Sequence, residues 1–126
     1  MDSRLSLGIC AAILTVSLTA PPAWAHHGWG GNSEEEFELS GTVDTGVSLA
    51  GPHATMKLKT ADGKVWDLTL APPAATNRAG LKEGVIPVGA PVTIHGHRNL
   101  DPKRLEVKTE RVTWNGRTFN VYPDRK

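Results

Sequence analysis

Short segments of alternating apolar and polar residues run through most of the chain, and they constrain its fold more than any other feature. In residues 37–43, Phe37, Leu39 and Val43 alternate with polar neighbours. The same strand-like pattern recurs in residues 53–60, 65–71, 91–97, 104–114 and 117–122. Successive side chains of a β-strand point to opposite faces, so a period of two is typical of half-buried strands. The sequence therefore predicts an all-β domain.

Turn and helix signals arrange these strands into a specific order. Asp62-Gly63 and Asn115-Gly116 are dipeptides typical of tight hairpin turns. Residues 72–84 begin with two prolines and contain Gly80 and Gly84, which favours a short helix there. A helix between the third and fourth of five or six strands is the order of a small barrel like the OB-fold. The alternative is an open β-sandwich, but closure into a barrel would remove exposed strand edges.

Two glycines within the predicted strands indicate unusual backbone packing. Gly41 stands on the apolar face of its strand, where a bulge or a sharp bend is expected. Gly96 separates two histidines, and its missing side chain lets another segment approach closely.

Residues 1–25 have the composition of a cleaved export signal. Arg4 precedes an apolar run over residues 5–20, and Ala23-Trp24-Ala25 places small residues at the positions that signal peptidase reads. The alternative is a membrane anchor, but the run is shorter than the roughly 20 residues of a spanning helix, and no charged stop follows it. We therefore expect a periplasmic protein that is cleaved after Ala25 and has no further membrane attachment.

The composition limits the chemistry that the mature chain, after cleavage, can carry out. The only cysteine is Cys10, so the mature chain has neither a disulfide nor a thiolate ligand or nucleophile. The formal net charge is +1, which argues against a general nucleic-acid-binding protein. We expect an arm over residues 26–36 and one barrel domain over residues 37–123.

The mature chain would begin with two histidines, and this is the strongest chemical signal in the sequence. The α-amine of His26 has a pKa of about 8, so amine and imidazole together form a feasible metal chelate at neutral pH. His27 offers a second scheme, in which the amine, the intervening backbone nitrogen and the second imidazole bind Cu(II). Trp29 is placed to hold the arm on the barrel.

Three further histidines are candidate metal ligands. His95 and His97 are two residues apart in a predicted strand, so both should project from the same face, away from the core. Imidazole suits copper, zinc and nickel, and two adjacent imidazoles can share one ion. The alternative is that both are solvated surface residues. His53 follows Pro52 at a strand start and is either a further ligand, a residue that orients one, or a turn histidine bonded to a nearby carbonyl.

An N-terminal histidine combined with His95 and His97 resembles the copper site in a subunit of particulate methane monooxygenase, in these three residues alone. Most of residues 26–120 resembles a family of small exported bacterial proteins that carries only a domain-of-unknown-function label. The segments that carry the resemblance are His26-His27-Gly28-Trp29, Pro52-His53, the strand around Trp66, Arg78-Ala79-Gly80 and residues 92–98. The resemblance implies export and a small β-barrel, and it implies no reaction. His95 stands where the family often has another residue.

Two functions of different classes follow from these observations. The first is a periplasmic protein that stores, delivers or senses a metal ion, copper above all. It would bind the ion through the amine and ring of His26 together with His97, helped by His27, His53 or His95. The second is a non-metal OB-type module that binds a ligand or another envelope protein through aromatic residues. An open coordination position would also permit a copper oxidase. However, the sequence contains no readable substrate cleft and no nucleophile motif, so we expect binding rather than catalysis.

Overall fold

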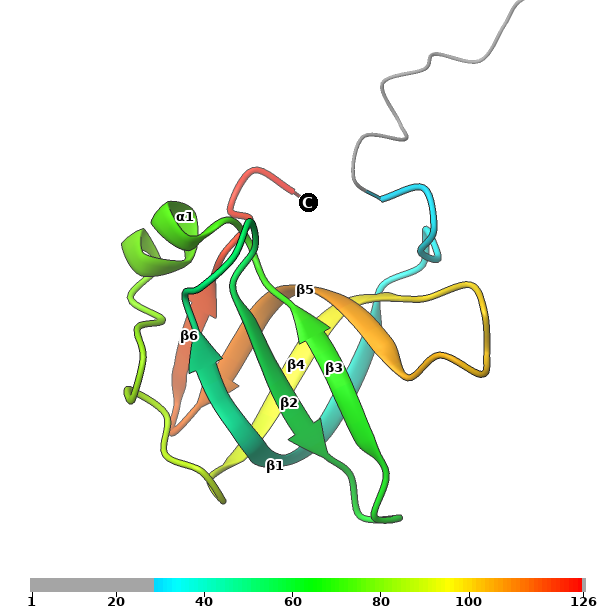
Figure 1. Cartoon of the computed structure of the whole chain (residues 1–126), viewed down its shortest axis with the longest axis horizontal. Helices are drawn as coiled ribbons and strands as arrows, with labels where there is room; N and C mark the ends of the chain where they lie inside the picture. The colour runs from blue at the N-terminus through cyan, green and yellow to red at the C-terminus, as the bar shows by residue number, and fades with distance from the viewer. Residues whose placement is uncertain (1–28, 126) are drawn as a thin grey trace, which may run out of the picture.

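Six strands and one short helix follow one another in the predicted order in the computed structural model, which describes residues 29–125 (Figure 1). The elements are β1 (Phe37–Ser48), β2 (Thr55–Lys59), β3 (Val65–Thr69), α1 (Pro73–Arg78), β4 (Pro91–Arg98), β5 (Glu106–Trp114) and β6 (Arg117–Asn120). β1 continues to Ser48, past the predicted end at Val43. The predicted signal peptide and the first two histidines, His26 and His27, lie outside the described residues.

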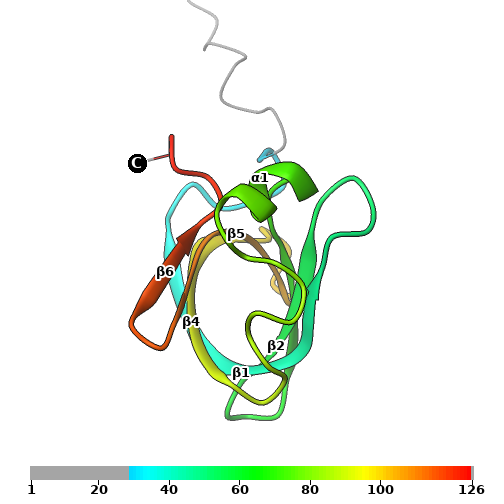
Figure 2. The same ribbon diagram turned by 90° about the vertical axis from the view of Figure 1, so that its left-hand side faces the viewer.

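The strands form a closed barrel with one additional strand. Their order is β3-β2-β1-β4-β5-β6, with antiparallel pairing between neighbours. A parallel pairing of β3 with the first part of β5 joins the two sides, and Figure 2 shows the resulting ring. β6 pairs only with the last part of β5. This arrangement confirms the predicted OB-like barrel and excludes the open sandwich.

Alternate strand residues fill the interior of the barrel. The core includes Val43, Met56, Leu58, Trp66, Leu68, Ile94, Val107, Val112 and Phe119, each less than 10 % exposed. Burial of one such apolar side chain stabilises the fold by about 1.5–3 kcal/mol, which offers a physical basis for a small domain without disulfides. Because Trp66 is part of this core, its ring is not on a surface where a ligand could stack.

The hairpin and helix signals are confirmed. Asn115 and Gly116 both have positive φ, as a two-residue hairpin turn of this kind requires. α1 has Pro73 at its first position, and Gly80 follows its end with a φ of 88°.

α1, the C-terminal segment and the start of the described chain lie at the same end of the barrel (Figures 1 and 2). No helix in residues 29–125 is long and apolar enough to cross a membrane.

The strand pair β4–β5 contains a β-bulge at Gly96. His95 is opposite Arg111, but the next residue, Gly96, is opposite Thr109, so Glu110 is the extra residue on β5. A Cβ atom at Gly96 would lie 2.3 Å from the carbonyl oxygen of Lys108. The expected close approach of another segment at Gly96 is therefore present. Gly41 is similar, since a Cβ there would lie 2.4 Å from the backbone of Lys59.

Candidate functional site: a buried histidine beneath the N-terminal arm

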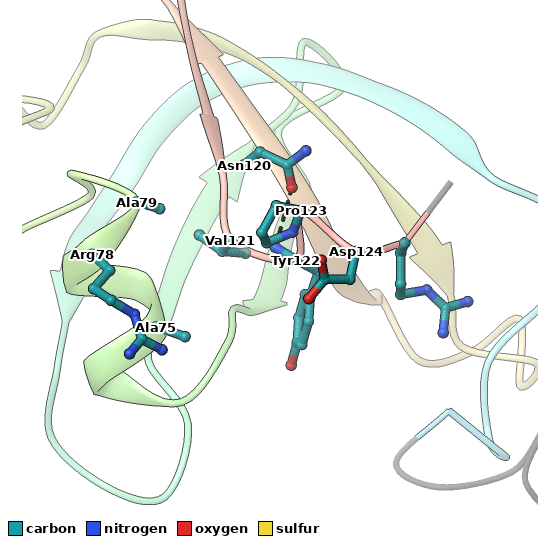
Figure 3. Close-up of a pocket in the computed structure, with 9 residues that line it drawn as sticks. Ala75, Arg78, Ala79, Asn120, Val121, Tyr122, Pro123 and Asp124 are labelled. Carbon is teal, nitrogen blue, oxygen red and sulfur yellow. Dashed lines mark hydrogen bonds between the residues drawn. The ribbon is translucent and has the colours of Figure 1, made fainter.

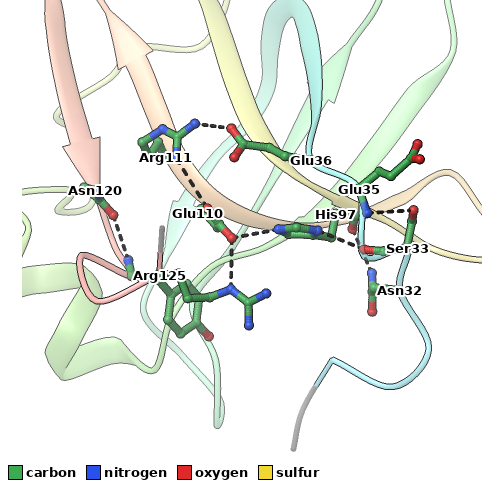
Figure 4. Close-up of polar contacts among 10 residues, drawn as sticks. Asn32, Ser33, Glu35, Glu36, His97, Glu110, Arg111, Asn120 and Arg125 are labelled. Carbon is green, nitrogen blue, oxygen red and sulfur yellow. Dashed lines mark hydrogen bonds and ion pairs between the residues drawn. The ribbon is translucent and has the colours of Figure 1, made fainter. Parts of the chain in front are cut away.

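His97 is the centre of a buried polar network that joins three parts of the chain. Its side chain comes from β4, and the residue is only 5 % exposed. Its Nδ1 atom lies 2.8 Å from the carbonyl oxygen of Ser33 in the arm, and its Nε2 atom lies 2.7 Å from Oε1 of Glu110 on β5 (Figure 4). His97 therefore connects the arm to the bulge in β5, which is a different environment from the solvated face that the sequence suggested as an alternative.

The partners of Glu110 define the hydrogen-bond roles in this network. Arg125 donates through Nε to Oε1 of Glu110 at 3.0 Å, and Arg111 approaches Oε2 at 3.4 Å. A Glu110 carboxylate with two guanidinium groups beside it accepts hydrogen bonds and donates none. The carbonyl of Ser33 can only accept. A His97 ring that donates from both nitrogens satisfies both acceptors, and such a ring has no lone pair left for a metal ion.

Glu110 also holds the C-terminal segment through its backbone. The amide of Val121 donates to the carbonyl oxygen of Glu110 at 2.9 Å. This bond continues the pairing of β5 with β6 by one residue past Asn120, where β6 ends, two residues before the predicted end of the strand at residue 122. At the bulge, the buried Glu110 therefore contacts His97, the C-terminal Arg125 and the backbone that follows β6.

Trp29 covers this network from the arm side. Its ring centroid lies 5.4 Å from that of His97 and 5.1 Å from that of Tyr122, both in edge-to-face geometry. The guanidinium of Arg125 lies 3.9 Å from the ring centroid, and the ammonium of Lys108 lies 4.7 Å from it. The structure thus places Trp29 where the sequence analysis expected it, holding the arm on the barrel.

Backbone hydrogen bonds hold the arm along the end of β4. The Ser33 amide donates to the carbonyl of Arg98 at 2.8 Å, and the Leu100 amide donates to the carbonyl of Gly31 at 3.0 Å. The side-chain amide of Asn32 donates to the carbonyl of His97 at 2.8 Å. The arm is therefore an integral part of the site.

The surroundings of Trp29 are positively charged. Burial lowers the pKa of the Lys108 ammonium, and the charge of Arg125 lowers it further. Burial raises the pKa of the Tyr122 phenol, an effect that Arg125 partly opposes.

His95 and His53 lie in different environments from His97. The Nε2 atom of His95 lies 2.9 Å from Oε2 of Glu38 on β1, and its Nδ1 atom is buried without a hydrogen-bond partner among the described residues. His53 lies in the bend before β2, half-buried, and makes no hydrogen bond or ion pair with another described residue. Within residues 29–125, no three His, Cys, Asp or Glu side chains are grouped as a metal site.

Replacement of Trp29 by alanine should release the arm while the barrel stays folded. Trp29 contacts four side chains, and its loss removes their packing at a cost of about 2 kcal/mol, below the 3–5 kcal/mol typical of a fully buried Trp. We expect faster hydrogen exchange of the Ser33 and Leu100 amides, measured by NMR. Trp114→Ala is the control, since it should leave these two amides protected. Unchanged exchange in Trp29→Ala would show that the backbone hydrogen bonds alone hold the arm.

Comparison with known proteins gives a family but no activity. No curated protein matches this sequence. Residues 13–108 match the model of a family that is described only as one of unknown function. This match agrees with the resemblance seen in the sequence to a family with a domain-of-unknown-function label, while export and the N-terminal motif stay predictions. Because the match covers most of the chain, from before β1 into β5, the protein belongs to the family of unknown function DUF6152.

Proposed function

We propose that this protein is an exported, periplasmic metal-binding protein and that copper is its metal. The proposal rests on the chemistry of a chain that starts at His26, where an amine and an imidazole on one residue form a chelate ring and His27 adds a second imidazole. Nitrogen ligands of this kind suit Cu(II). As a binding protein, it would store, deliver or sense the ion.

The structural observation that carries the proposal is the attachment of the arm. Trp29, two residues after His27, contacts His97, Tyr122 and Arg125. A ligand set that lies directly before an anchored residue in the chain loses less conformational freedom on binding than one on a free tail. The barrel would thus serve as the support that presents the N-terminal ligands.

The environments of the other histidines suggest separate roles for them. We assign His97 the role of holding the arm, because its two ring nitrogens already bond to Ser33 and Glu110. A role as ligand would require His97 to leave one of them. His53 and His95 each keep at least one ring nitrogen without a partner in residues 29–125, so they are the candidates for completing the coordination.

Adding one methionine before His26 should weaken Cu(II) binding by about tenfold or more. The extension moves the terminal amine out of the chelate ring, and loss of about 1.4 kcal/mol already changes a dissociation constant tenfold. The measurement is a Cu(II) titration of protein processed at Ala25, followed by electron paramagnetic resonance. One tight equivalent with a nitrogen-rich signal supports the proposal.

Two variants make this test specific. His26→Ala keeps the terminal amine but lacks the imidazole, so it should lose affinity as the Met-extended protein does. Lys59→Ala changes an exposed residue of β2 and should leave the affinity unchanged. Equal Cu(II) affinity of the processed and Met-extended proteins would contradict the proposed site.

A further inference from the structure

A pocket of about 520 Å³ lies between α1 and the C-terminal segment, and Tyr122 and Arg125 are shared between it and the network around His97 (Figure 3). Volumes of this order hold small organic ligands. Ala75 and Arg78 of α1 lie on one side in Figure 3, and Tyr122 and Asp124 lie on the other. No histidine lines the pocket, so its function does not depend on the proposed metal site.

The walls of the pocket are mainly apolar. Val121 is buried and forms part of the wall between the two sides, while Ala75 and Ala79 present only methyl groups from α1. The ring of Tyr122 and the ring of Pro123 line the opposite side. The small side chains of α1 leave space beside the C-terminal segment that a ligand of matching shape would fill.

The charged groups at the rim favour an anion. Arg78 makes no hydrogen bond or ion pair with any residue in the part of the chain that the structure describes. Arg125 lies at the other end of the lining and bonds to Glu110 only through Nε. Asp124 is the single acidic residue among those that line the pocket, so the guanidinium groups outnumber it. Arg78 is the better placed donor because its guanidinium has no competing partner.

We propose that this pocket binds a small carboxylate that has an apolar body, with Arg78 as the group that receives the carboxylate. A planar guanidinium can donate two parallel hydrogen bonds to a carboxylate. The apolar body of the ligand would then lie between α1 and Val121. This site develops the second function considered from the sequence, a binding module of the OB type, and identifies its ligand by class.

The test uses hexanoate as the probe, added to the exported protein labelled with ¹⁵N for NMR. We expect shifts of the Ala75, Ala79, Val121 and Tyr122 amides that saturate with a dissociation constant of roughly 1 mM, as fits so small a ligand. Hexan-1-ol has the same chain without the charge and should bind at least about fivefold more weakly. Because copper is absent throughout, the result is independent of the metal proposal.

Two variants and one control test the roles of charge and shape. Arg78→Gln should weaken hexanoate binding by about fivefold, and Ala75→Leu should weaken it by filling the pocket. Arg104→Gln removes the same charge from an exposed turn residue that does not line the pocket, and it should bind as the parent does. A spectrum of each variant recorded without ligand and compared with that of the parent protein shows whether the variant is folded.

Three outcomes would overturn the proposal. The first is the absence of saturable shifts at the four amides. The second is equal affinity for hexan-1-ol, which would exclude recognition of the carboxylate. The third is an equal loss in Arg78→Gln and Arg104→Gln, which would mean that hexanoate responds only to net charge.

Discussion

Gly96→Ala should destabilise the protein by about 3 kcal/mol or more, because β4 and β5 approach each other too closely at this position for any side chain. The new Cβ would lie 2.3 Å from the carbonyl oxygen of Lys108 and 2.9 Å from Cα of Thr109, both backbone atoms. Backbone atoms of a paired strand cannot move aside without breaking the ladder. Inserting a group into such a space costs about 1–3 kcal/mol in ordinary cores and more where the contact is to backbone.

The matched control is Gly46→Ala in β1, where no atom lies within 4 Å of the new Cβ and φ is not positive. That substitution should be neutral or stabilising by about 0.4–1 kcal/mol, because it restricts the unfolded chain. Urea unfolding of both variants gives the comparison, with an unchanged m-value showing that the unfolding transition is the same. A Gly96→Ala midpoint equal to that of Gly46→Ala would show that the strands separate easily at the bulge.

The barrel was predictable because its signals are local. Period-two patterns, the Asn115-Gly116 turn and the proline pair before α1 each act within a few residues, and together they identify the order of the elements. Strand ends were less predictable. The last strand stops at Asn120, two residues before its alternating pattern ends, because the next residue of its partner β5 is Glu110, the extra residue of the bulge.

The environment of His97 depends on contacts between distant parts of the chain, and strand periodicity carries no information about them. The His97 ring bonds to Ser33, which is 64 residues away in the sequence, because the arm folds back over β4. Alternation correctly places His97 on the opposite face of β4 from Ile94. It cannot show that Trp29 and Arg125 cover that face and bury the ring.

Glu110 and Arg125 are the site residues that the sequence analysis missed. For Glu110, the spacing of the apolar residues around it contains a signal. Val107 and Val112 are both buried on β5, yet they are five residues apart, and a regular strand would place them on opposite faces. An extra residue between them restores both to the core, which predicts a bulge near Glu110. Arg125 has no comparable signal, since it lies beyond the last strand.

Glu110→Ala should cost about 3–5 kcal/mol of stability, the range seen when one partner of a buried ion pair is removed. The Glu110 side chain is 5 % exposed and accepts hydrogen bonds from His97 and Arg125, with Arg111 beside it. Without the carboxylate, the buried His97 ring keeps a donor with no acceptor. We expect a lower urea midpoint and, at low urea, faster exchange of the Ser33 amide, because the ring no longer holds the arm.

Glu38→Ala is the matched control, since Glu38 also bonds to a histidine but its side chain is 63 % exposed. Exposed ion pairs contribute less than about 1 kcal/mol, so this variant should unfold close to the parent midpoint. The two pairs have nearly equal nitrogen–oxygen distances, 2.9 Å for His95–Glu38 and 2.7 Å for His97–Glu110. A difference in stability between the variants would therefore measure burial and the additional arginine partners of Glu110 rather than the geometry of the histidine pair.

The double variant His97→Phe/Glu110→Leu separates two quantities: the contribution of the His97–Glu110 pair to the free energy of unfolding, and the destabilisation caused by removing only one partner. Replacing both partners by apolar groups of similar size leaves no unpaired charge between them, so its loss should be smaller than that of Glu110→Ala. If stability recovers but the Ser33 amide still exchanges quickly, the pair serves to position the arm and with it the N-terminal histidines. If the double variant is instead less stable than Glu110→Ala, the ion pair itself stabilises the barrel, and its link to the arm is secondary.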